Sequence, residues 1–118
     1  MMLVDTSVWV EHFRMGDIGL EAPLKEGKVF CHPFIVGELA CGNLKNRSRI
    51  LVLLDTLPMA HLAEHEEVMR FIEKNRLMGK GLGYIDMHLL ASAILTNIPL
   101  WTLDKRLHSI STTLGVNL

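Results

Sequence analysis

Short apolar runs alternate along the chain with longer segments in which apolar side chains recur at helical spacing. The apolar runs predict buried strands at residues 2–5, 28–31, 57–62 and 99–102, with a short edge strand at 116–118. Helical spacing predicts helices at 7–14, 20–26, 33–42, 49–56, 64–78, 84–96 and 104–114, the first with Ser7 as its N-cap. We therefore expect one α/β domain over residues 1–118, a three-layer α/β/α sandwich around a central parallel sheet of four or five strands.

The composition is typical of a chain that folds without cross-links. A chain of 118 residues buries roughly two thirds of its unfolded surface, which suffices for a core. Cys31 and Cys41 are too few for a disulfide scaffold, so we interpret them as thiols in a reducing cytoplasm. No apolar run approaches the ~18 residues that span a bilayer, and we expect no membrane association. The hydrophobic content of 49% indicates apolar surface shared with a partner, and we expect a homodimer.

The charge pattern limits how the chain can bind nucleic acid. A net charge of -1 gives no overall attraction to a polyanion, so binding must depend on local basic patches. Three such patches occur, each of which is also compatible with a solvated helix surface: Lys45, Arg47 and Arg49; Lys74, Arg76 and Lys80; Lys105 and Arg106.

Four acidic residues occupy apolar contexts. Ligand sites in parallel sheets lie beyond the carboxyl ends of the strands, where Asp5 and Asp104 fall, at and shortly after a predicted strand end. Glu38 lies within the apolar stretch FIVGELA, and Asp86 lies near the start of YIDMHLLASAIL. Each acid also has a local explanation, because Asp104 can cap a helix, Asp86 can complement a helix N-terminus and Glu38 can face solvent.

Taken together, the four carboxylates predict a metal site. Ionised carboxylates that are crowded together repel one another, unless one protonates or a divalent cation neutralises them. Mg²⁺ and Mn²⁺ prefer oxygen ligands, and such ions support phosphodiester hydrolysis. The hydroxyls of Ser7 and Thr102 follow two of the predicted strand ends and can orient a carboxylate or a water there.

Other patterns are interpreted as structural. HLAEH at 61–65 has the histidine spacing of some zinc sites, but its first histidine lies in a predicted strand, before the helix. GKGLG at 79–83 follows a helix and lacks the third glycine of a dinucleotide-binding loop. We expect His88 to be a packed, hydrogen-bonded histidine, and Trp9 and Trp101 to lie in the core or an interface.

Four stretches carry a family resemblance: MMLVDTSVWV, IVGELACG, GKGLGYIDMHLLASA and PLWTLDKRL. In this order they resemble the motifs of PIN domains, and more closely those of VapC-type toxin ribonucleases. The resemblance implies a Mg²⁺- or Mn²⁺-dependent endoribonuclease that forms a homodimer and is inhibited by a small antitoxin protein. It also implies roles by residue: Asp5, Glu38, Asp86 and Asp104 as the catalytic, metal-binding acids, with Ser7 and Thr102 as supporting hydroxyls.

The chain departs from many relatives after the last motif, where Lys105 and Arg106 replace an acid and an aromatic residue. With Lys80 they are candidate RNA contacts. Two alternative functions stay open, a PIN-like module that binds RNA or a partner without cutting and an RNA-processing nuclease without an antitoxin. The presence of all four acids favours an enzyme over a module that only binds. A phospho-receiver would need an aspartate at the end of the predicted strand 57–62, which has none. A haloacid-dehalogenase-type phosphatase would need an acid at position 7, where the chain has Ser7.

Overall fold

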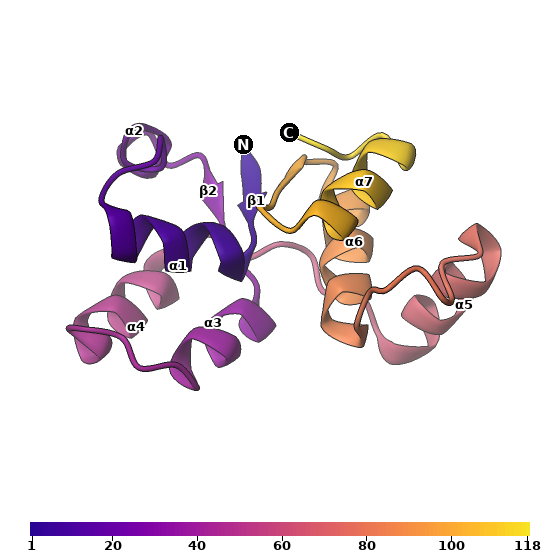
Figure 1. Cartoon of the computed structure of the whole chain (residues 1–118), viewed down its shortest axis with the longest axis horizontal. Coiled ribbons are helices and arrows are strands. Elements are labelled where there is room, and N and C mark those ends of the chain that lie inside the picture. Colours follow the sequence, from indigo (N-terminus) through magenta and orange to yellow (C-terminus); the bar gives the residue numbers. More distant parts are fainter.

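Three strands and seven helices make up the computed structural model, which describes residues 1–118 (Figure 1). The strands are β1 (Met2–Val4), β2 (Val29–Phe30) and β3 (Leu100–Trp101). The helices are α1 (Thr6–Met15), α2 (Glu21–Lys25), α3 (Pro33–Ala40), α4 (Arg47–Thr56), α5 (His65–Asn75), α6 (Tyr84–Thr96) and α7 (Lys105–Thr113). No helix has the length and apolar character needed to cross a membrane.

The N-terminal strand lies at the centre of the sheet. The strand order is β2-β1-β3, and both pairings are parallel. Leu3 pairs with Phe30 on one side and with Leu100 on the other. Because Leu3 and Val4 are fully buried, the apolar run at the start of the chain forms the inner strand of the core.

The sheet has fewer strands than the four or five that the sequence predicts. Residues 57–62 contribute one bridge, in which Cys31 N–H donates to Pro58 O and Ala60 N–H donates to Cys31 O, both at 2.8 Å. Pro58 has no N–H with which to extend that ladder. On the opposite edge, Leu100 and Asn117 form the second isolated bridge. Both outer segments therefore flank the sheet in the expected places without forming strands.

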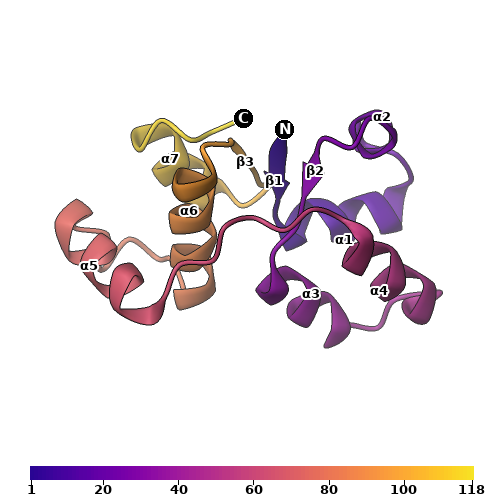
Figure 2. The ribbon, with the colours of Figure 1, turned by 180° about the vertical axis from the view of Figure 1, so that it is seen from behind.

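Helices cover both faces of this sheet, as predicted for a three-layer sandwich. Helices α1 to α4 gather on one side and α5 to α7 on the other (Figures 1 and 2). Residues 87–93 of α6 are all buried, which is typical of a helix enclosed by the core. The predicted bounds of α6 are confirmed, whereas α5 ends earlier than expected because Arg76 adopts left-handed backbone angles.

One predicted helix start is wrong. The N-cap of α1 is Asp5, and Ser7 lies within the first turn. Ser7 cannot cap the helix because its hydroxyl is engaged elsewhere, donating to Asp5 Oδ2 and accepting from Leu103 N–H. This hydroxyl ties the start of α1 to the segment that follows β3.

Candidate functional site

Asp5 is a nearly buried carboxylate held by two hydroxyls. It follows β1 directly, and only 6% of its surface is exposed. Ser7 Oγ and Thr102 Oγ1 each donate to Asp5 Oδ2 at 2.7 Å, and Thr102 lies 97 positions away along the chain. These bonds replace the water that burial removes from the carboxylate. Both residues named as supporting hydroxyls thus contact the Asp5 carboxylate directly.

The same hydroxyls fix the segment that leads to Asp104. Thr102 Oγ1 accepts from Asp104 N–H at 3.1 Å, and Ser7 Oγ accepts from Leu103 N–H at 3.0 Å. Asp104 is the N-cap of α7, and its Oδ1 accepts from Leu107 N–H at 2.9 Å. The capping role considered for Asp104 is therefore real, and it holds the carboxylate in one orientation.

Asp86 lies in the first turn of α6, where its Oδ2 accepts from Gly83 N–H at 3.0 Å. The pKa of Asp86 is raised above its ordinary value, chiefly by burial and further by the negative charges of Asp5 and Asp104, while the bond from Gly83 opposes the rise. Asp5 and Asp104 therefore lie close enough to Asp86 for their charges to act on its carboxylate, and we call these three residues the acidic site.

Glu38 is linked to the start of α1 through Thr6, the residue after Asp5. It is exposed on α3, and its Oε1 accepts from Thr6 Oγ1 at 2.7 Å. Glu38 is not among the charges that raise the pKa of Asp86. No sequence pattern singled out Thr6, although its position directly after Asp5 was the available signal.

Each of the four acids keeps one oxygen free of protein donors. The accepting oxygen is Oδ2 in Asp5 and Asp86, Oδ1 in Asp104 and Oε1 in Glu38. None of the four carboxylates forms an ion pair within 4 Å. Oriented carboxylates with a free oxygen are the donors that Mg²⁺ and Mn²⁺ prefer. No three His, Cys, Asp or Glu side chains meet at one cation position. Mg²⁺ commonly uses only one or two carboxylates and several waters, so the donor set fits.

A cluster of aromatic and histidine rings lies between α3 and α6. The His88 ring contacts Phe34 and Tyr84 edge to face, with centroids 4.8 and 4.6 Å away. His88 is packed as predicted, but the hydrogen bond expected for it is absent. His32 is 2% exposed, and its Nδ1 accepts from Phe34 N–H while its Nε2 has no partner. Burial, followed by the charge of His88, lowers the pKa of His32 to about 4.

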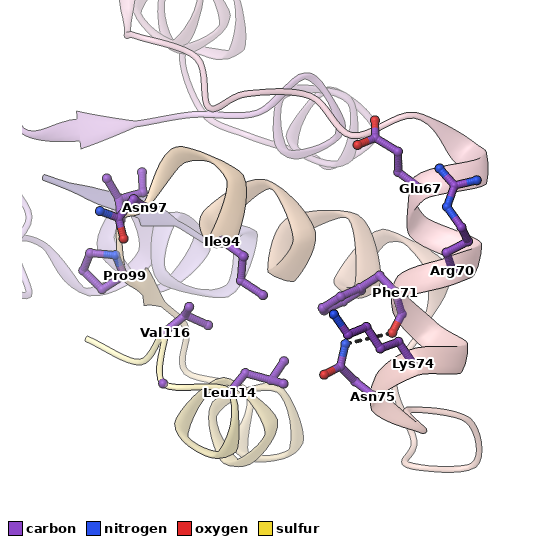
Figure 3. A pocket seen from close by; sticks show the side chains of 12 residues that line it. Glu67, Arg70, Phe71, Lys74, Asn75, Ile94, Asn97, Pro99, Leu114 and Val116 are labelled. Atoms are coloured by element: carbon purple, nitrogen blue, oxygen red, sulfur yellow. Dashed lines mark hydrogen bonds between the residues drawn. The ribbon is translucent and has the colours of Figure 1, made fainter.

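A cavity of considerable volume lies apart from the four acids. It has a volume of about 870 Å³ and lies between α5, the end of α6 and residues 114–116 (Figure 3). Arg70 and Lys74 line it together with apolar side chains such as Phe71 and Ile94. None of the four candidate acids reaches it.

A smaller groove of about 450 Å³ brings together the three candidate RNA contacts, Lys80, Lys105 and Arg106. Lys105 and Arg106 come from the first turn of α7, and Lys80 comes from the loop before α6. The sequence named these three residues from separate segments, and the structure places them side by side.

Comparison with known families decides the classification. The PIN domain family model matches residues 2–112. The chain belongs to the PIN-domain family. Its relatives include Ribonuclease VapC32 from two strains of Mycobacterium tuberculosis, CDC 1551 / Oshkosh and ATCC 25618 / H37Rv. Each is 44% identical over 119 residues, covering 100% of this PIN domain and 96% of the relative.

A solved structure supports the fold independently. The crystal structure of PAE2754 from Pyrobaculum aerophilum superposes with a TM-score of 0.62, covering 97% of this chain and 88% of the other. The identity of 17% is low, so this likeness concerns the fold of the PIN domain alone.

Proposed function

We propose that this PIN domain is a divalent-metal-dependent endoribonuclease that acts as the toxin of a toxin-antitoxin pair. The full-length similarity to Ribonuclease VapC32 supports ribonuclease activity. The observation that carries the chemistry is the nearly buried Asp5, oriented by Ser7 and Thr102 beside two further aspartates. A binding module that does not cut has no evident need for such a costly cluster of charges.

The residues present define what each group can do. When bound to Asp5, Asp86, Asp104 or Glu38, Mg²⁺ or Mn²⁺ would supply an activated water and stabilise charge on the scissile phosphate. Ser7 and Thr102 hold the Asp5 carboxylate in place, and the Leu107 N–H does the same for Asp104. Burial and the charges of Asp5 and Asp104 raise the pKa of Asp86, so its carboxyl holds a proton more readily than an ordinary aspartate does.

We also propose two protein partners: an antitoxin that binds over the acidic site, and a second copy of the chain that binds through exposed apolar side chains. An antitoxin that covers the acids would prevent RNA from reaching them. Large apolar residues are exposed on α4 and at the end of α6, among them Val52, Leu53, Ile94 and Leu95. Such side chains support a shared surface and hence the proposed homodimer. Light scattering of the purified chain tests this, and a monodisperse monomer at micromolar concentration would contradict it.

Metal dependence is tested by cleavage of single-stranded RNA with Mg²⁺, Mn²⁺ or EDTA. We expect cleavage only with metal. We also expect metal to stabilise the native state by about 2.7 kcal/mol at a hundredfold excess over the dissociation constant. Thermal melts measure this gain, which Asp5→Asn should largely remove and Asp55→Asn, on the exposed face of α4, should preserve. Cleavage that survives both EDTA and Asp5→Asn would disprove the metal mechanism.

Toxicity is tested separately by expressing the chain without an antitoxin. Wild type should arrest growth, and Asp5→Asn should relieve the arrest at equal protein level. If the purified enzyme cuts RNA while both chains are harmless in the cell, the function is RNA processing and the toxin assignment is wrong.

A further inference from the structure

A groove of positive charge begins one residue after Asp104, at the edge of the acidic site. Lys80, Lys105 and Arg106 line it, with Ser109 and Thr113 farther along α7. We propose that this groove is a subsite for the backbone phosphates of single-stranded RNA, next to the position of cleavage. The proposal rests on the proposed nuclease function and adds the path that the substrate takes.

The three cations of the groove are available to a ligand. All are exposed, and none lies within 4 Å of a carboxylate. Lys25 and Lys28, by contrast, are paired with glutamates. Ser109 makes no side-chain hydrogen bond, so its hydroxyl is a further donor. Two ammonium groups, a guanidinium and a hydroxyl around one groove are the donors that bind phosphate oxygens.

The Arg106 side chain packs against the backbone of Gly81. Gly81 has a φ of +81°, and a Cβ built on it would lie 2.8 Å from both Cδ and Nη1 of Arg106. The arginine therefore packs directly on the backbone of the loop 79–83. The same loop supplies the Gly83 N–H that binds Asp86. One short segment thus positions both an acid of the site and a cation of the groove.

The shape of the groove favours a strand over a single small anion. It follows α7 from Lys105 to Thr113, which is about 12 Å at 1.5 Å per residue. A strand whose scissile phosphate lies at the acids needs cations for its neighbouring phosphates, because the acids repel them. This groove supplies unpaired cations directly beside Asp104.

The first experiment measures binding without cleavage. Fluorescence anisotropy of labelled, random-sequence single-stranded RNA is followed in the Asp5→Asn background with Mg²⁺ present, over a series of salt concentrations. Lys105→Ala and Arg106→Ala should weaken binding, and each should reduce the slope of log K against log salt by about 0.7 for every phosphate that the variant no longer neutralises. Lys74→Ala removes an equal charge at the cavity beside α5 and should leave the slope nearly unchanged.

The second experiment moves the arginine without removing charge. Gly81→Ala should displace Arg106 and weaken RNA binding. Gly79→Ala is the matched control, because Gly79 also has a positive φ of +70° while a Cβ there meets nothing. Circular dichroism establishes that all variants are folded.

The outcomes separate the two proposals. Equal losses for Lys74→Ala and Arg106→Ala, equal losses for both glycine variants, or no measurable RNA binding would overturn the subsite. A wild-type chain that cuts RNA with a KM unchanged by Lys105→Ala would overturn it as well. If the groove variants behave as expected but wild type cuts no RNA, the nuclease function fails and the RNA-binding groove stands.

Discussion

The acidic site and the large cavity differ in almost every physical respect. At the acidic site the aspartates are held by hydroxyl and backbone donors, most of them within three residues and one, Thr102, 97 positions from Asp5. The cavity between α5, α6 and residues 114–116 has a volume of about 870 Å³, but Arg70 and Lys74 on its wall are exposed and carry no ion pair.

The comparison shows that constrained charge and cavity volume mark different regions of this molecule, and our proposal for the chemistry rests on the constrained charge. Holding Asp5 nearly buried costs free energy, and one nearby hydroxyl, Ser7, together with one distant hydroxyl, Thr102, offsets that cost. None of the four buried polar atoms without partners lines the large cavity.

The largest expected effect is at Asp5. Asp5→Asn keeps the size of the side chain and its ability to accept from Ser7 and Thr102 but removes the charge. We expect kcat/KM for RNA cleavage to fall by more than the ~100-fold typical of losing an outer partner of a metal ligand. Asn75→Ala, at the cavity, should cleave like wild type. Similar losses of kcat/KM in both variants would show that the acidic site and the cavity do not differ in their importance for cleavage.

Removing one hydroxyl should have a smaller effect. Thr102→Val deletes the donor to Asp5 and the acceptor for Asp104 N–H at nearly constant volume. We expect kcat/KM to fall about 10–100-fold, as for other residues that orient a metal ligand. Thr56→Val is the control, because that exposed hydroxyl only donates to Leu53 O. A Thr102→Val enzyme of wild-type activity would show that orientation of Asp5 is unimportant.

Asp86→Asn should raise stability while it lowers activity. A folded-state pKa that is raised means that the native state loses stability as pH increases from the ordinary aspartate value through the raised value. Asparagine avoids this loss, so the gain in Tm should be present at neutral pH and disappear in more acidic solution. Thermal melts across pH measure it. A Tm lowered at neutral pH would mean that the bond from Gly83 outweighs burial and repulsion.

The smallest effect is expected at the cavity wall. Arg70→Ala removes an exposed charge without an ion pair, so the free energy of unfolding should change by less than about 0.5 kcal/mol. RNA cleavage by this variant should stay within twofold of wild type, a change of about 0.4 kcal/mol in the barrier. A tenfold loss in a cleavage assay would assign the cavity a part in the reaction.

The sequence could place Asp5, Asp104, Ser7 and Thr102 because strand ends in a parallel sheet share one edge. It could also define α6, whose apolar run has a clear start and end. It could not count the strands, since a segment such as 57–62 has strand-like composition while its pairing depends on backbone donors that Pro58 lacks. Composition does not record which hydrogen bonds form.

The sequence was least informative where two distant segments compete for one group. Serine is a common N-cap residue, but the Ser7 hydroxyl instead donates to Asp5 and accepts from Leu103 N–H. The bond from Leu103 is a tertiary contact that no local sequence pattern encodes. The Thr6–Glu38 bond is of the same kind, since it joins α1 to α3 across 32 positions. Such bonds become visible only when the fold has brought the segments together.

The central position of β1 has a consequence for the timing of folding. This strand is synthesised before β3, although β3 is one of its two neighbours in the sheet. Pairing of such separated segments is slow, because the intervening chain must be ordered before the contact forms. The Thr102 hydroxyl that holds Asp5 arrives with the same late segment. A growing chain on the ribosome therefore carries Asp5 without the partner that orients it until the segment with β3 and Thr102 has been made.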